Sequence, residues 1–133
     1  MTRRIAAATV LTLGALGVGH TPPAAAKGQS LRAWCASHAD QLPYAGLIRQ
    51  HLPAVMTRVS CCESNGKSGA GQHHASKGLL QVNWAANGPA LRRAGIAYSA
   101  GDLYVPSVNV RAAAYVLRTQ GLTAWNPSRR CWA

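Results

Sequence analysis

Apolar residues recur at helical spacing in a segment near the middle of the chain. Between Pro53 and Glu63 they lie three or four positions apart, which places one group on a single helix face: Val55, Met56, Val59 and Cys62. Proline suits the first position of a helix, so we expect this helix to open at Pro53. Glu63 lies one turn after Val59, and therefore at the helix end, on or beside the apolar stripe.

Two shorter helices are expected before this one. Ser30 can cap a helix that runs to about Gln41, because its hydroxyl can accept a hydrogen bond from a first-turn amide. Pro43 opens the second, with Leu47 and Ile48 on one side.

Turn residues divide the rest of the chain. Glycine and small polar residues dominate residues 64–77, which indicates a loop, and the apolar residues 78–82 suit either an extended segment or a helical turn. Pro89 is expected to start a small helix closed by Gly95. Pro106 should open the longest helix, which Gly121 ends. No alternating strand pattern exceeds a few residues, so the fold class is mainly α.

The N-terminal residues resemble an export signal. Arg3 and Arg4 precede a predominantly apolar run of 14 residues, 5–18, and an Ala-rich stretch ends at Ala26. A membrane anchor is the alternative, but a spanning helix needs about 20 apolar residues. We therefore expect a secretory signal peptide over residues 1–26 and one small mature domain over residues 27–133, without a separate wall-binding domain and monomeric by default.

The chain is strongly basic, with 14 Lys and Arg residues, three acidic residues and a formal net charge of +11. Loss of Arg3 and Arg4 with the leader leaves a charge of about +9. Such a charge attracts polyanions, either nucleic acid or an anionic cell envelope. Export favours the envelope, so the protein is expected to be secreted or wall-associated and not to bind nucleic acid.

All four cysteines lie in the expected mature domain: Cys35, Cys61, Cys62 and Cys131. An even number in a small exported chain predicts two disulfides. Zinc is the rival, with ligands from His73 and His74, but the Cys-x-x-Cys spacing of a zinc site is absent, so no metal or cofactor is expected. A bond between the adjacent Cys61 and Cys62 would be strained. Two pairings remain, 35–61 with 62–131 or 35–62 with 61–131.

Glu63 is the only glutamate of the chain. A lone glutamate at a helix end is usually a surface charge. Beside an apolar stripe, however, its charged form is disfavoured and its pKa rises, so it can serve as a general acid. Glycosidases commonly use two carboxylates, and only Asp40 and Asp102 could supply the second. Asp102 lies in a turn, where it suits a cap. A reaction that needs one carboxyl group fits this composition better.

Three short motifs, in order and at fitting spacing, resemble the lytic transglycosylase family of the lysozyme-like superfamily. They are Glu63-Ser64, the Gly-Leu-Leu-Gln of residues 78–81, and the Pro-Ser-Val-Asn of residues 106–109, which opens an alanine-rich helix. The resemblance covers roughly residues 54–125. It implies a lysozyme-like domain with an irregular or short β region after the catalytic helix.

The resemblance also implies an activity and a set of site residues. The family cleaves the MurNAc–GlcNAc β-1,4 bond of peptidoglycan glycan strands and leaves 1,6-anhydro-MurNAc ends. Glu63 would carry out both proton transfers. The expected substrate-binding residues are Ser64, Gly78, Gln81, Tyr104, Asn109 and Trp125. For Ser64, Gly78 and Asn109 a cap or turn role is the alternative, and for Trp125, as for Trp84, it is core packing.

Departures from the family pattern concern the surroundings of the acid. Gln72 stands where the family often has a serine, and the family's Ala-Tyr-Asn-Ala-Gly motif is replaced by residues 121–127. Tyr98 and Tyr104 are the candidates for an aromatic hydroxyl near Glu63. Cys62 precedes the acid as in the related resuscitation-promoting factors, which implies the pairs Cys62–Cys131 and Cys35–Cys61.

Three other functions remain open at this stage. A lysozyme-type hydrolase of the same fold would need an acid that positions water, and the next one after Glu63 is the distant Asp102. A protein like the resuscitation-promoting factors would share the substrate. A non-enzymatic cationic envelope-binding module would need no catalytic acid at all.

Overall fold

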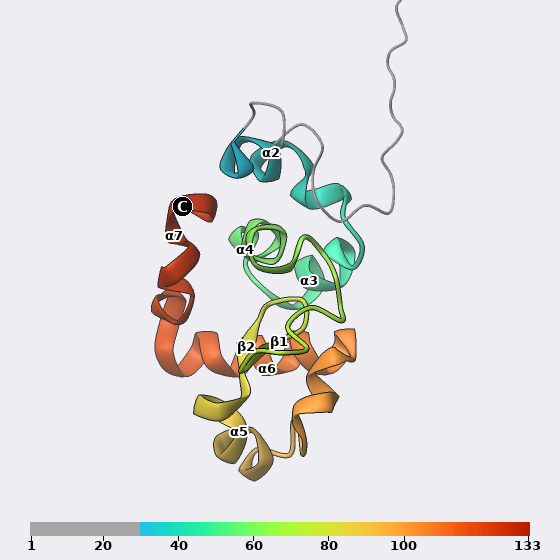
Figure 1. The fold of residues 1–133 in the computed structure, drawn as a ribbon, viewed down its shortest axis with the longest axis vertical. Coiled ribbons are helices and arrows are strands. Elements are labelled where there is room, and N and C mark those ends of the chain that lie inside the picture. The colour runs from blue at the N-terminus through green and yellow to red at the C-terminus, as the bar shows by residue number, and fades with distance from the viewer. Residues whose placement is uncertain (1–29) are drawn as a thin grey trace, which may run out of the picture.

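The computed structural model describes residues 30–133, a mainly helical chain with one small hairpin (Figure 1). Helix α4 lies in the middle of the molecule, the hairpin lies between α4 and α6, and α5 lies at the far end from α2. In chain order the elements, with η for 3₁₀ segments, are α2 (Leu31–His38), η2 (Ala39–Gln41), α3 (Ala45–His51), α4 (Val55–Ser64), β1 (Ser76–Lys77), β2 (Val82–Asn83), α5 (Trp84–Arg93), η3 (Ala100–Tyr104), α6 (Pro106–Gln120), η4 (Gly121–Ser128) and α7 (Arg129–Trp132).

The expected signal peptide of residues 1–26 lies outside the described residues. Within residues 30–133, no helix combines the length and the apolar character that crossing a bilayer requires.

Most of the predicted helices are present, but α3 and α4 begin at Ala45 and Val55, two residues after the prolines expected to open them. The first predicted helix ends at His38 and continues to Gln41 only as a 3₁₀ segment.

The start signals of α2 and α6 act as expected. The Ser30 hydroxyl accepts a hydrogen bond from the Ala33 amide (3.1 Å) and caps α2. Pro106 is the first residue of α6, where its missing N–H costs no helical hydrogen bond, and Gly121 follows the last residue with φ 69°.

The helix predicted to start at Pro89 was placed wrongly. Helix α5 begins five residues earlier, at Trp84, and Pro89 lies inside it. The start is fixed by Asn83, whose side-chain oxygen accepts a hydrogen bond from the Ala86 amide (3.0 Å) and so satisfies one of the free N-terminal N–H groups.

The apolar stripe predicted on α4 faces the main core. Met56 and Val59 are fully buried there, together with Ile48 of α3 and with Val110 and Ala113 of α6. The loop between β1 and β2 adds Leu79 and Leu80, both also fully buried. These residues fix the end of α4 against the hairpin loop and α6.

The hairpin is the short β region expected after α4. Its strands are antiparallel and only two residues long, with Ser76 opposite Asn83 and Lys77 opposite Val82. Residues 78–81 form its turn.

Two disulfides join segments that are far apart in the sequence. Cys35–Cys61 connects α2 to α4 and forms the centre of a second, smaller apolar cluster. Cys62–Cys131 connects α4 to α7, across 69 residues. This is the pairing that the resemblance implied. With all four cysteines paired, none is a free thiolate that could bind zinc in the described chain.

Candidate active site

Glu63 is the second-last residue of α4, and the helix ends just after it for a local reason. Asn65 adopts a left-handed conformation (φ 54°) and its amide bonds the Cys61 carbonyl (2.9 Å), a common way for a helix to stop. Gly66 continues the turn with φ 75°. The chain therefore leaves the helix one turn after the buried Val59, and the Glu63 carboxyl lies partly buried at the edge of the core.

Two opposing effects act on the Glu63 carboxyl. Partial burial raises its pKa, because the charged form loses hydration. A hydrogen bond from the Ser128 hydroxyl to Oε2 (2.5 Å) lowers the pKa, because it stabilises the charged form. Burial has the larger effect, and the pKa lies above its ordinary value. The side chain can therefore hold a proton at a higher pH than an exposed carboxylate can.

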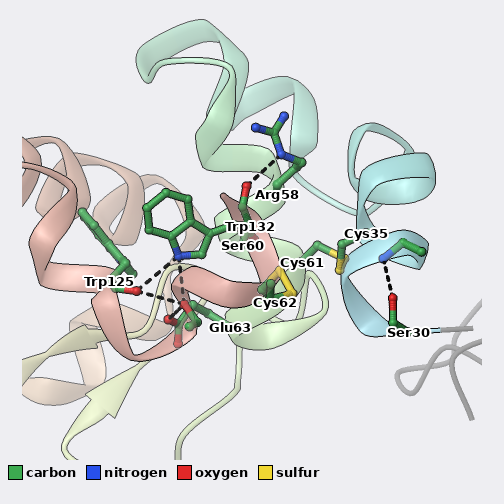
Figure 2. Close-up of a disulfide and its surroundings, with 12 residues drawn as sticks. Ser30, Cys35, Arg58, Ser60, Cys61, Cys62, Glu63, Trp125 and Trp132 are labelled. Atoms are coloured by element: carbon green, nitrogen blue, oxygen red, sulfur yellow. Dashed lines mark hydrogen bonds between the residues drawn. A yellow bond between two sulfur atoms is a disulfide. The ribbon is translucent and has the colours of Figure 1, made fainter.

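The C-terminal tail supplies the groups around this carboxyl (Figure 2). The Trp132 indole N–H donates to Ser128 Oγ (3.1 Å) and to the Trp125 carbonyl (3.2 Å). Trp132 itself is buried, and Arg58 of α4 donates to its carbonyl (3.1 Å). The Cys62–Cys131 bond, next to Glu63 in Figure 2, ties the same tail to α4 covalently.

The contact between Ser128 and Glu63 is not predicted by any local sequence pattern. Ser128 lies 65 residues from Glu63 in the chain and belongs to none of the recognised motifs. The one sequence feature that points to this contact is the expected Cys62–Cys131 bond, because it brings the residues before Cys131 close to the end of α4.

The two other motifs contact each other through Asn109. Its side chain is fully buried, and its oxygen accepts a hydrogen bond from the Leu80 amide (2.9 Å). Its amide group donates to the carbonyls of Lys77 and Leu103 (both 2.9 Å). Asn109 thus holds the hairpin turn, and the Leu103 carbonyl before α6, against the start of α6.

Ser64 connects the first motif to the same turn. Its hydroxyl lies within hydrogen-bonding distance of the Leu79 carbonyl (2.7 Å) and of the Ser60 carbonyl one turn back (3.1 Å). The residue is 7 % exposed. Its contacts are internal, and they position the end of α4 relative to the hairpin turn.

Gly78 and Gln81 both adopt left-handed backbone conformations in this turn, with φ 79° and 48°. A side chain at position 78 would meet the Leu103 carbonyl at 2.2 Å and the Asn109 amide at 2.3 Å, so only glycine fits this close approach. The Gln81 side chain donates to the Gly78 carbonyl (3.0 Å) and lines a cavity of about 250 Å³.

The cavity has polar amides and an apolar wall. Val82, Val116 and the buried Trp125 contribute apolar surface, and no lining residue carries a charge. The amides come from Gln81, Asn83, Asn87 and Gln120; Gln120 donates to Asn87 (2.8 Å). Trp125 donates its indole N–H to the Leu80 carbonyl (2.7 Å), while its own carbonyl belongs to the network beside Glu63. Trp125 therefore takes part both in the lining of the cavity and in the hydrogen-bond network of the acid, whereas Glu63 does not line the cavity.

The aromatic residues considered near the acid have other neighbours. Tyr98 is 64 % exposed, and Tyr104 packs under the Lys77 ammonium group at 6.0 Å from its ring centre. Trp84 packs under Arg92 (5.4 Å). The hydroxyl that bonds Glu63 comes from a serine and not from either tyrosine.

The two aspartates are engaged away from Glu63. Asp40 pairs with Arg49 (3.2 Å) on the surface. Asp102 caps η3 by accepting hydrogen bonds from the Tyr98 and Ser99 amides (2.8 and 3.2 Å), the capping role predicted for it. The Tyr98 bond is the main reason that the pKa of Asp102 lies below its ordinary value. Neither aspartate has a hydrogen bond that links it to Glu63.

Comparison of the chain with models of known protein families, with curated proteins and with solved structures found no match.

Proposed function

We propose that this protein is a secreted lytic transglycosylase with a lysozyme-like fold, which cleaves the MurNAc–GlcNAc bond of peptidoglycan with Glu63 as its single acid and base. The observation that carries the proposal is the position of a partly buried carboxyl at the end of α4, where Ser64 joins the hairpin turn. Burial at this position raises the pKa of the carboxyl. The three segments that resemble the family's motifs are thereby linked by hydrogen bonds, through Ser64 and Asn109.

The chemistry would need one carboxyl group in two protonation states. Protonated Glu63 donates its proton to the glycosidic oxygen as the bond from that oxygen to the muramic C1 breaks, and the substrate's acetamido group stabilises the cation. The Glu63 carboxylate then takes the proton from the muramic 6-hydroxyl, whose oxygen bonds to C1 and closes the anhydro ring. Water takes no part in the reaction, so no second acid is required to position it.

The positions of the other acids favour this reaction over hydrolysis. Both aspartates, the remaining acidic residues of the chain, have partners elsewhere. A hydrolase with two carboxylates would need one of them opposite Glu63 across the substrate.

Charge and disulfides agree with a place outside the cell. The net charge of about +9 left after removal of Arg3 and Arg4 suits retention on an anionic envelope and attraction of substrate. Two disulfides are typical of proteins in oxidising compartments. The uncharged amides around the cavity near Trp125 suit the neutral acetamido and hydroxyl groups of glycan strands.

The proposal is tested with dye-labelled peptidoglycan and two forms of residues 27–133, wild type and Glu63→Gln. Glutamine keeps the shape and can still accept the Ser128 hydrogen bond, but it cannot transfer a proton. The wild type should release soluble fragments, and the variant should bind the labelled wall equally well without releasing any. Equal release by both proteins would refute the role of Glu63. Binding without release by either would favour the cationic binding module.

A further inference from the structure

We propose that Ser128 is a positioning residue for Glu63: its hydroxyl holds Oε2, directs the other carboxyl oxygen to the substrate, and stabilises the carboxylate that exists between the two proton transfers. This inference rests on the proposed function and assigns a role to a residue outside the motifs that suggested that function.

The donors and acceptors around Ser128 determine where its proton points. A serine hydroxyl has one proton to donate and can accept two hydrogen bonds. The Trp132 indole N–H can only donate, and it lies 3.1 Å from Ser128 Oγ. This contact occupies one acceptor site of the hydroxyl. The hydroxyl proton is left to two acceptors, Glu63 Oε2 at 2.5 Å and the Trp125 carbonyl at 3.2 Å.

The second acceptor makes the hydroxyl responsive to the charge on Glu63. A hydrogen bond to a carboxylate is stronger than one to a neutral acid, so the hydroxyl is drawn to Glu63 most strongly once the acid has given up its proton. When Glu63 is protonated, the Trp125 carbonyl can share the hydroxyl proton. The interaction therefore stabilises the Glu63 carboxylate, which forms as the first proton is transferred, more than it stabilises the protonated Glu63 of the ground state. An interaction that is stronger in the transition state than in the ground state accelerates the step.

The hydrogen bond also distinguishes the two oxygens of the carboxyl group. Among residues 30–133, Oε2 takes part in a hydrogen bond and Oε1 in none. With Oε2 held by the tail, Oε1 is the oxygen left to exchange a proton with the sugar.

The tail that carries Ser128 is fixed in place, so the hydroxyl is preorganised. Cys131, three residues later, is bonded to Cys62, the neighbour of Glu63. Trp132 is buried, and Arg58 holds its carbonyl. Fixed donors stabilise a developing charge without the cost of reorienting at the moment of reaction.

The test uses the fact that Glu63 is the only glutamate of the chain. The protein is produced with glutamate labelled with ¹³C at the side-chain carboxyl, and exchange of the label into other residues is suppressed. The single labelled carboxyl then belongs to Glu63, and its chemical shift reports the Glu63 titration directly. The proteins compared are the wild type, Ser128→Ala and Ser128→Thr. In the alanine variant Trp132 keeps the Trp125 carbonyl as a partner, so the tail should stay folded, which thermal unfolding checks.

We expect Ser128→Ala to titrate at higher pH than the wild type, and its rate of peptidoglycan cleavage to fall roughly tenfold or more. The high-pH limb of its activity profile should move upward with the NMR titration. Ser128→Thr, which retains a hydroxyl, should restore both. A Ser128→Ala titration and cleavage rate equal to the wild type would overturn the inference.

Cleavage by the wild type tests the proposed function, and the Ser128 variants test the role of Ser128. If the wild type cleaves no peptidoglycan, the proposed function fails, and the catalytic role of Ser128 fails with it, although the titration still reports whether the hydroxyl controls the charge of Glu63. If the wild type cleaves and Ser128→Ala is merely unfolded, the threonine variant decides: a folded Ser128→Thr protein with a wild-type titration but a rate as low as that of Glu63→Gln would overturn the inference.

Discussion

At the scale of single residues, the protonation of Glu63 is the property on which the proposed chemistry depends. Burial at the edge of the core raises the pKa of its carboxyl, and one serine hydroxyl opposes the shift. The balance allows the side chain to be protonated for the first transfer and charged for the second. A fully exposed glutamate would lose the proton too readily, and a fully buried one would not release it.

This balance predicts a pH-dependent effect on stability. Because the folded state binds the Glu63 proton more tightly than the unfolded chain does, the carboxyl favours folding at low pH. That contribution is lost as the pH rises through the raised pKa of the folded state. Glu63→Gln, which carries no charge at any pH, should therefore be more stable than the wild type at neutral pH. Urea unfolding at several pH values should show this advantage shrinking as the pH falls toward the ordinary pKa of a carboxyl. An advantage that stays constant with pH would contradict the shift.

At the scale of elements, the hairpin turn is held in place by side chains rather than by its two-residue strands. Asn109 satisfies three backbone groups of two segments, and Ser64 reaches a fourth, the Leu79 carbonyl. These contacts bring the end of α4, the turn and the start of α6 together.

Removal of the Asn109 side chain should therefore be costly. Asn109→Ala removes the hydrogen bonds to the buried Leu80 amide and Leu103 carbonyl and to the partly buried Lys77 carbonyl, and each buried group left without a partner costs about 1–3 kcal/mol. We expect a loss of roughly 3 kcal/mol or more in the free energy of unfolding, measured with urea. The exposed Asn126 provides the matched control, since Asn126→Ala should change stability by less than about 0.5 kcal/mol. Equal effects of the two substitutions would show that Asn109 does not hold the turn.

Gly78 permits a separate test of the same turn. Gly78→Ala would place a methyl group 2.2 Å from the Leu103 carbonyl and would require a left-handed alanine. Together these should lower the free energy of unfolding by roughly 2–4 kcal/mol. Gly69→Ala is the control, because no atom lies within 4 Å of its added carbon and its φ is not positive. A Gly78→Ala protein as stable as the Gly69→Ala protein would mean that the loop moves freely away from η3 and α6.

The sequence predicted the elements better than the contacts between them. The stripe on α4, its end at Glu63 and the caps of α2 and α6 all follow from local rules of spacing and capping. The start of α5 was predicted wrongly, because the side-chain cap of Asn83 sets it and Pro89, the expected start signal, lies inside the helix. The Ser128–Glu63 bond depends on how the tail folds back over 65 residues, which no local pattern encodes.

At the scale of the whole molecule, the two disulfides have different relations to the site. Cys35–Cys61 fastens α2 to α4 in its own apolar cluster, whereas Cys62–Cys131 fastens to α4 the tail that carries Ser128. Both should stabilise the fold, by about 3–5 kcal/mol in the chain-entropy model.

Paired serine substitutions should separate the two roles. Replacing Cys35 and Cys61 should lower the melting temperature and leave the cleavage rate of the folded protein nearly unchanged. Replacing Cys62 and Cys131 should lower both, because the tail no longer holds the hydroxyl against Glu63. Rates are compared at a temperature where circular dichroism shows both variants folded. Equal losses of activity in the two variants would contradict a special role for the second bridge.

The most direct test of the central claim is the mass of the products. Purified peptidoglycan is digested with residues 27–133, with Glu63→Gln as the control, and the released muropeptides are analysed by mass spectrometry. Glu63 acting alone predicts products one water lighter than hydrolysis products, ending in 1,6-anhydro-MurNAc and absent from the control. Products with a free reducing end, made by the wild type and not by the variant, would mean that water is the acceptor and would contradict the transglycosylase mechanism.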